Sequence, residues 1–102
     1  MEPTDFGRFS DPAVLILASL AGGEKHGYAM MEDIQATNGV HLGPGTLYGA
    51  ISRLETEGLI EALPAQERRR PYRLTQQGAA FLRQYLASLQ KLVSLGYERL
   101  QL

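Results

Sequence analysis

The chain has 102 residues, a formal net charge of −1, ten Lys and Arg residues and no cysteine. This length predicts one domain with a modest hydrophobic core, and the lack of cysteine excludes disulfides and cysteine-based metal or redox sites. His26 and His41 are the only histidines, so we expect neither a metal site nor a cofactor. The first nine residues do not resemble a signal peptide, and no apolar run is long enough to span a membrane. We therefore expect a cytoplasmic protein without membrane contact.

The N-terminal part of the chain predicts a loose arm over residues 1–9, followed by a helix. The run from Ser10 to Pro12 combines a capping side chain with a proline at the first helical position, which is typical of a helix start. Residues 13–21 are apolar on nearly every side, and a helix of that kind is buried all round. Because a small monomer can hardly cover such a helix, we expect Leu15 to lie in an interface between two copies of the chain.

A second helix is expected from His26 to Thr37, with Tyr28, Met31 and Ile34 spaced to face the core. His26 stands at the start of this helix. Catalysis by His26 would need a nucleophile or an acid nearby, and the sequence offers no such arrangement. We therefore expect His26 to have a structural role, capping the helix and packing at its start.

The stretch from Pro44 to Glu57 predicts a third, short helix that is apolar on one side only. Leu47, Ile51 and Leu54 recur at helical spacing and would face the core. Small residues on the other side would let the helix approach DNA closely, and hydroxyl groups there can donate hydrogen bonds to phosphate. The candidate DNA contacts on this helix are Gly45, Thr46, Tyr48, Gly49, Ser52 and Arg53. For this helix taken alone, an ordinary amphipathic helix with a solvated face is the alternative.

Two β-like runs, Leu59–Leu63 and Tyr72–Thr75, predict a hairpin directly after the third helix. The arginine cluster Arg68–Arg70 lies between them, and arginine binds phosphate groups in a bidentate manner. A charged, solvated loop is the alternative. The position after the third helix instead favours DNA contact by Arg68, Arg69, Arg70 and the neighbouring Tyr72. We expect Arg73 to pair with an acid within the fold.

The last part of the chain predicts a long helix that Thr75 caps and that carries two apolar stripes. One stripe consists of Leu82, Leu86, Leu89, Val93 and Leu100. Two stripes on one helix indicate two partners, the helix's own domain and a second subunit. We expect this stripe, together with Leu15, to form a homodimer interface, and packing within one subunit is the alternative. Gly96 is a candidate for a kink or an end of the helix.

These elements together predict a mainly α fold with a small β-hairpin. A winged helix-turn-helix would span residues 1–75, and a C-terminal dimerisation helix would span residues 76–102. Such an architecture offers one element for the DNA major groove and another for the adjacent backbone. No catalytic constellation accompanies it, because Glu55, Glu57 and Glu61 have no cleft-forming context. The expected function is sequence-specific binding to double-stranded DNA, and the alternative is a winged-helix protein-interaction module without DNA affinity.

Three segments of the sequence, HGYAMMEDI, LGPGTLYGAISRLETEGLIE and RRRPYRLTQQG, resemble the PadR family of bacterial transcriptional regulators. The resemblance covers about residues 12–80, and its motifs are more specific than those of a generic winged helix. It implies a cytoplasmic homodimer, usually a repressor, that binds a pseudo-palindromic operator and is released by a small aromatic or drug-like effector. It also implies that the helix from Pro44 is the recognition helix, with Thr46, Tyr48 and Arg53 as contacts, and that Arg68–Arg70 form the wing.

The sequence departs from the family pattern in its capping, wing and aromatic residues. Gly43 stands where family members often have serine, the hairpin tip lacks the usual glycines, and the chain has no tryptophan. The chain resembles the small subclass with a single C-terminal helix, in which some members bind flat hydrophobic compounds at the dimer centre. In the absence of tryptophan, Phe9, Tyr85 and Tyr97 are the residues expected to contact such an effector.

Overall fold

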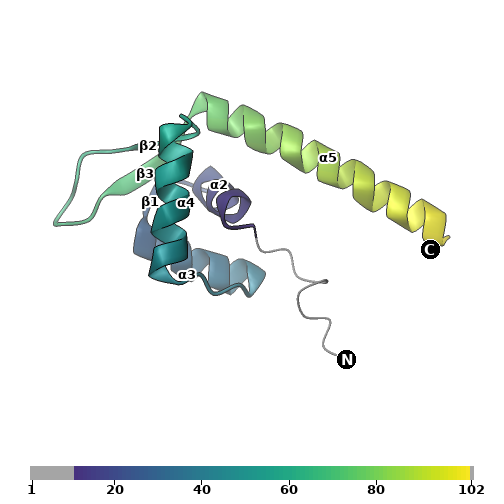
Figure 1. The fold of residues 1–102 in the computed structure, drawn as a ribbon, viewed down its shortest axis with the longest axis horizontal. Coiled ribbons are helices and arrows are strands. Elements are labelled where there is room, and N and C mark those ends of the chain that lie inside the picture. The colour runs from purple at the N-terminus through teal and green to yellow at the C-terminus, as the bar shows by residue number, and fades with distance from the viewer. Residues whose placement is uncertain (1–10, 102) are drawn as a thin grey trace.

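The computed structural model describes residues 11–101, so the predicted arm over residues 1–9, and with it Phe9, lies outside the described residues (Figure 1). In chain order the elements are α2 (Pro12–Ala21), β1 (Lys25–His26), α3 (Gly27–Asn38), α4 (Pro44–Thr56), β2 (Ile60–Ala62), β3 (Pro71–Leu74) and α5 (Gln76–Leu100). The prediction of a mainly α fold with a small sheet and a long last helix is confirmed.

Capping side chains determine where the first helices begin. The Asp11 carboxylate accepts a hydrogen bond from the Ala13 amide at 3.0 Å, and Pro12 follows as the first helical residue. At the start of α3 the His26 ring takes the same role, because its Nδ1 accepts from the Ala29 amide at 3.3 Å. The predicted capping role of His26 is confirmed, and α3 itself begins one residue later than expected.

The hydrophobic core is built around α2, which contacts α3, α4, α5 and β3. A single protomer covers this helix, and Leu15 is only 5% exposed without any partner. The largest fully buried side chains of the core are Ile16, Leu17, Met30, Ile34, Leu47, Ile51 and Ile60. The expectation that α2 needs a second subunit for its cover is therefore wrong, because neighbouring elements of the same chain surround it.

The inward face of α3 differs from the predicted one. Ile34 is buried as predicted, but Tyr28 is 56% exposed, and Met30 faces the core in its place. Met31, also predicted to face inward, is only partly buried. Both sets of residues fit helical spacing, so the apolar pattern did not separate them. The observed orientation leaves the Tyr28 hydroxyl accessible to water, which avoids burying a polar group without a partner.

The predicted hairpin forms, and a further strand completes an antiparallel sheet of order β1–β3–β2. The hairpin strands pair Ile60 with Leu74 and continue to Ala62, which lies opposite Tyr72. The strand β1, which pairs Lys25 with Tyr72 on the other side of β3, was not predicted. A strand of two residues is too short to show the alternation that identifies strands. Through β1, the start of α3 lies directly beside the hairpin.

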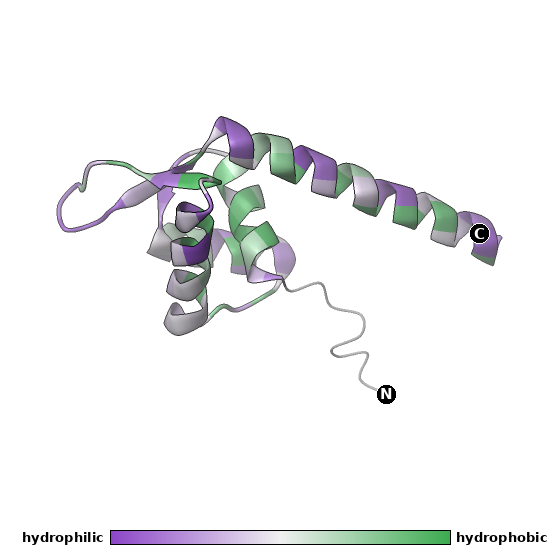
Figure 2. Ribbon diagram, turned by 45° about the horizontal axis from the view of Figure 1, so that its top comes forward, coloured by the Kyte–Doolittle hydropathy of each residue, from purple (hydrophilic) through white to green (hydrophobic). Residues whose placement is uncertain are grey.

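The last helix, α5, has 25 residues and is about 37 Å long at 1.5 Å per residue. It continues through Gly96 to Leu100, so of the two roles considered for Gly96, a kink or an end of the helix, the end is wrong. Its first turns pack on the domain through Leu82, and the rest extends away from the domain on the side opposite the hairpin loop (Figure 1). Figure 2 shows polar and apolar bands alternating along this extended part. Between residues 11 and 101, no helix has the length and apolar character of a membrane span.

Candidate nucleic-acid interface

The helix α4 has one buried side and one exposed side. Leu47, Ile51 and Leu54 are buried, as predicted. The six candidate DNA contacts are all exposed: Gly45, Thr46, Tyr48, Gly49, Ser52 and Arg53. Gly43 precedes the helix and makes no side-chain capping bond, so the first backbone amides of α4 have no side-chain cap of the usual kind. An acceptor such as a phosphate oxygen could bind these amides.

The connection between β2 and β3, residues 63–70, forms the wing, and it turns tightly at Glu67 and Arg68. Gln66 and Arg69 exchange two backbone hydrogen bonds, of 2.6 and 2.8 Å, across this turn. Glu67 and Arg68 both have positive φ, 47° and 71°, which is the conformation of a two-residue hairpin turn that glycine and asparagine favour. The wing thus closes tightly without glycine, and all three arginines of the cluster Arg68–Arg70 are exposed.

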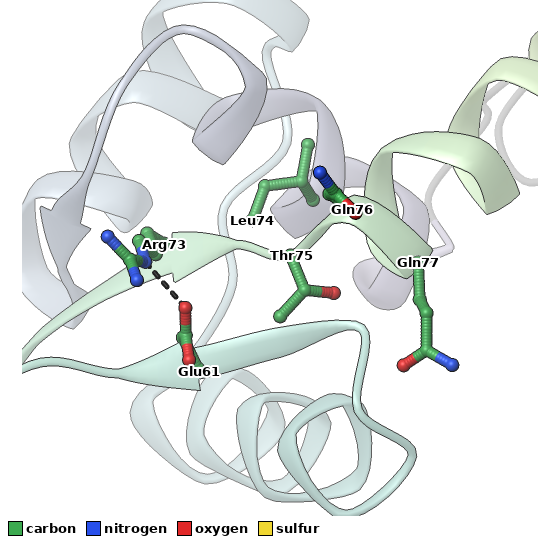
Figure 3. A pocket seen from close by; sticks show the side chains of 6 residues that line it. All are labelled: Glu61, Arg73, Leu74, Thr75, Gln76 and Gln77. Carbon is green, nitrogen blue, oxygen red and sulfur yellow. Dashed lines mark hydrogen bonds and ion pairs between the residues drawn. The ribbon is translucent and has the colours of Figure 1, made fainter.

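The arginines near the wing differ in the partners that they have within the fold. The Nη1 of Arg69 lies 3.1 Å from Nε2 of His26, and the Nη1 of Arg70 donates to the Leu63 carbonyl at 3.1 Å. Arg73 forms an ion pair with Glu61, its Nε lying 2.5 Å from the carboxylate (Figure 3). The prediction that Arg73 pairs with an acid is confirmed. Arg73 therefore already has an acidic partner within the fold. Both residues of the pair line a broad hollow of about 500 Å³ at the base of the hairpin.

A pocket of about 270 Å³ joins the recognition-helix candidate α4 to the wing. Tyr48 of α4, Arg68–Arg70 of the wing and Tyr72 of β3 line it together with His26 and Gly27 at the start of α3. The structure thus brings together five of the predicted contact residues, from α4, the wing and β3. His26 and Gly27 were not predicted to be parts of this surface, because β1 places them there and a two-residue strand has no sequence signal.

Tyr72 is partly buried within this pocket, and its pKa is raised above the usual value. Burial is the main cause, and the nearby carboxylate of Glu55 adds to it, while the positive charge of Arg70 acts in the opposite direction. The phenol of Tyr72 therefore stays protonated at neutral pH. It can donate a hydrogen bond to an anion that enters the pocket.

The apolar stripe of α5 divides into a covered and an uncovered part. Leu82 is 6% exposed within the protomer, so this residue, like Leu15, has little area left for a second contact. Farther along, Leu86 and Val93 are about half exposed, and Leu100 is 68% exposed. Leu89, between them, is partly buried. The uncovered part of the predicted interface is therefore the stretch from Leu86 to Leu100.

Tyr85 and Tyr97, the two predicted effector contacts that the structure describes, do not meet within one protomer. Tyr85 packs against the core beside Phe81, with the two ring centroids 6.2 Å apart. Tyr97 is 57% exposed on the same helix, about 18 Å farther along its axis at 1.5 Å per residue. One flat compound cannot lie against both tyrosines of a single chain. Within the described range, no group of three or more His, Asp or Glu side chains is placed to hold a metal ion.

Comparison with known proteins relates this chain to a family. Residues 16–84 match the transcriptional regulator PadR-like family. An uncharacterized 37.1 kDa protein in transposon TN4556 of Streptomyces fradiae is 41% identical over 85 residues, which are 83% of this chain and 25% of that protein. The chain thus spans about a quarter of the length of that relative.

Solved structures share the fold. A transcriptional regulator from Clostridium thermocellum is 27% identical, with a TM-score of 0.75 over 84% of this chain and 89% of that one. A PadR family transcriptional regulator from Eggerthella lenta is 28% identical, with a TM-score of 0.73 over 86% of this chain and 80% of that one. A PadR family regulator from Clostridium difficile has a TM-score of 0.79 at 24% identity, over 87% and 97% of the two chains. The last of these supports the fold alone.

Proposed function

The chain belongs to the PadR-like family of transcriptional regulators, and from this premise we propose that it acts as a homodimer that binds a specific double-stranded DNA operator. Membership in the family makes it a regulator of transcription and not an enzyme. The identity of the DNA-contacting residues, the formation of a dimer and the existence of an effector are proposals.

One observation carries the proposal. Tyr48 of α4 and the wing arginines line the same pocket, so α4 and the wing form one continuous surface. The extended part of α5 points away from the wing loop (Figure 1). A duplex bound on the first surface would therefore leave the apolar stripe of α5 free to pair with a second copy.

The exposed side of α4 suits the major groove. Gly45 and Gly49 add no side chain, so the helix backbone can come close to the base pairs, and Thr46, Ser52 and Arg53 can reach phosphates or base edges. The arginines of the wing would contact the backbone beside this groove. A two-fold dimer would present two such surfaces to half-sites about one helical turn apart, so the operator would be pseudo-palindromic.

Repression and effector release complete the proposal, and they depend on the dimer. We propose that the bound dimer blocks transcription and that a small hydrophobic or aromatic compound releases it. The predicted contacts for such a compound, Tyr85 and Tyr97, could form one site only if the two tyrosines came from different subunits. A regulator of this kind acts where the chromosome is, so we place the protein in the cytoplasm.

The direct test is fluorescence anisotropy with the DNA upstream of the protein's own gene and a scrambled duplex of equal length, at two salt concentrations. We expect tighter, salt-sensitive binding to the upstream duplex. Arg69→Ala should weaken binding to both duplexes and reduce the slope of log K against log salt by about 0.9 for each phosphate that Arg69 neutralises. Arg73→Ala is the matched control, because Arg73 already pairs with Glu61 and should leave the slope unchanged.

Two outcomes would contradict parts of this proposal. Equally weakened binding by the Arg69→Ala and Arg73→Ala variants would show that the wing arginines have no special role at the DNA. No binding of the wild-type protein to either duplex at low salt would favour a protein-interaction module with the same fold.

A further inference from the structure

Gly27 and Tyr48 are in direct contact, and this contact depends on glycine having no side chain. A Cβ atom at position 27 would overlap the Tyr48 hydroxyl and would lie 2.7 Å from Cζ of the ring. Tyr48 therefore lies across the first residue of α3 instead of pointing straight out from α4. The φ angle of Gly27 is not positive, so glycine at this position makes space for the observed Tyr48 ring and is not needed for the backbone conformation.

The Tyr48 ring closes one side of the pocket described above, and the start of α3 and the wing form its other sides. Apart from Gly27, every residue that lines it has a polar or charged side chain: His26, Tyr28, Tyr48, Arg68, Arg69, Arg70 and Tyr72. The acids Glu55 and Glu67 lie on neighbouring parts of α4 and the wing turn but do not line the pocket. The pocket therefore offers positive charge and hydrogen-bond donors, and its natural occupant is an anion.

The contacts of His26 place two donors against a ring that can accept from only one of them. The Ala29 amide lies 3.3 Å from Nδ1, and Nη1 of Arg69 lies 3.1 Å from Nε2. Both neighbours can only donate, yet a neutral imidazole has one nitrogen that accepts and one that donates. The ring can satisfy the helix cap or Arg69, but not both. An anionic oxygen beside Nε2 would accept from Arg69 and from the Nε2 proton together, while Nδ1 keeps the cap.

We propose that this pocket binds one phosphodiester group of the DNA backbone and that Gly27 is the positioning residue that allows Tyr48 to form its wall. This inference rests on the DNA-binding function proposed above. A phosphodiester has two non-bridging oxygens that share one negative charge. One oxygen can accept from His26 and Arg69, and the other can accept from the Tyr48 hydroxyl. A phosphate held between α4 and the wing would fix the register of the protein on the duplex.

The first experiment compares Gly27→Ala, Tyr48→Ala and the double variant by duplex anisotropy at several salt concentrations. A methyl group at position 27 would displace the Tyr48 ring, so we expect Gly27→Ala to bind about tenfold more weakly. The salt slope should fall by about 0.9, because one phosphate of the duplex would no longer be bound in the pocket. In the Tyr48→Ala background, Gly27→Ala should not weaken binding further, because the ring that it displaces is gone. If Gly27 instead acted independently of Tyr48, Gly27→Ala would weaken binding equally in both backgrounds. Gly22→Ala is the control, because Gly22 has an ordinary helical φ of −82° and lies outside the pocket.

The second experiment uses Tyr48→Phe, which keeps the ring and its packing on Gly27 and removes only the hydroxyl. Single phosphates of the duplex are replaced, one position at a time, by neutral methylphosphonates. The wild-type protein should bind about tenfold more weakly when one particular position in each half-site is neutral. At that position Tyr48→Phe and Gly27→Ala should be affected markedly less, because their interaction with this phosphate is already weak or absent.

Wild-type affinity and slope in Gly27→Ala, or an equal effect of Gly27→Ala in both Tyr48 backgrounds, would overturn the inference. Inorganic phosphate, at ionic strength matched with chloride, separates the two possible sources of the anion. If phosphate displaced the duplex from the wild-type protein but not from Gly27→Ala, and no methylphosphonate position mattered, the pocket would hold free phosphate and the DNA assignment would be wrong. A wild-type protein that binds no duplex would instead overturn the proposed function itself, and the inference with it.

Discussion

Gly78, in the first turn of α5, packs directly on the backbone carbonyl of Leu59. A Cβ atom at position 78 would overlap the Leu59 oxygen and lie 2.9 Å from its carbonyl carbon. Thr75 strengthens this junction, because its hydroxyl donates to the Gly58 carbonyl at 2.7 Å and its amide donates to the Leu59 carbonyl at 3.1 Å. The start of α5 is thereby held on the turn after α4. The direction of α5, the proposed dimerisation helix, is thus fixed relative to α4, the helix proposed to bind DNA.

Gly78→Ala should destabilise the protein by about 3 kcal/mol, because the backbone of Leu59 cannot move away as a flexible side chain can. Urea unfolding followed by circular dichroism measures this change. Gly96→Ala on the same helix is the matched control. Nothing lies within 4 Å of its added methyl group, so the substitution should raise stability by up to about 1 kcal/mol. Equal effects of the two substitutions would contradict the contact with Leu59.

The wing turn leads to a second prediction, because Glu67 holds a positive φ of 47° without being glycine or asparagine. Glu67→Gly should raise the free energy of unfolding by about 1 kcal/mol through relief of this strain. It should also strengthen DNA binding, since it removes a negative charge beside Arg68. Glu67→Gln removes the same charge and keeps the backbone strain, so it should strengthen DNA binding only. Thermal unfolding and duplex anisotropy on both variants separate the two effects.

Sequence reasoning succeeded where the signal is local and periodic. Leu47, Ile51 and Leu54 define the buried side of α4 by spacing alone, and the exposed residues of that helix follow from them. The end of α3 was predicted to within one residue, at Thr37 where the helix ends at Asn38, and the next residue, Gly39, has the left-handed φ of 68° that favours glycine at a helix end. These features depend on neighbours within a few residues.

Features that depend on distant parts of the chain were missed. The contact between Gly27 and Tyr48 joins α3 to α4, and neither residue carries a sign of the other. Leu15 was assigned to a dimer because the apolar run gives no hint of how many elements surround it. The pairing of Lys25 with Tyr72 likewise has no pattern that a sequence could show. Composition and spacing predict which side of an element is apolar, but not what covers it.

A partly buried hydrogen bond between α2 and α3 gives a third prediction. The Ser19 hydroxyl donates to Oδ2 of Asp33 at 2.6 Å, and Ser19 is only 6% exposed. A double-mutant cycle with Ser19→Ala and Asp33→Ala should give a coupling energy of about 1–2 kcal/mol, because the acceptor is a carboxylate. Thr37→Ala is a control on the same helix, since its hydroxyl donates only to the Asp33 carbonyl at the surface. A coupling energy near zero would show that the bond adds nothing to stability.

The uncovered stripe of α5 supplies the last prediction, which concerns the dimer. Val93 is 49% exposed in one protomer, and a two-fold axis would bring this side of α5 against the same side of the partner. Val93→Asp would place a charge in that interface from both subunits, so we expect the dimer dissociation constant to rise by at least about a hundredfold. Sedimentation velocity at several protein concentrations measures it.

Ser94→Asp is the matched control for this prediction. It adds the same charge at the next residue, about 100° around the helix and off the stripe, so it should leave the dimer intact. The Val93→Asp monomer should stay folded, because its side chain is not part of the protomer's core. It should also bind a single half-site as the wild-type protomer does, without the tight binding to the full operator that two linked half-sites provide. A Val93→Asp protein that remains dimeric at the wild-type concentration would place the interface elsewhere, and α5 would then need another partner for its apolar side.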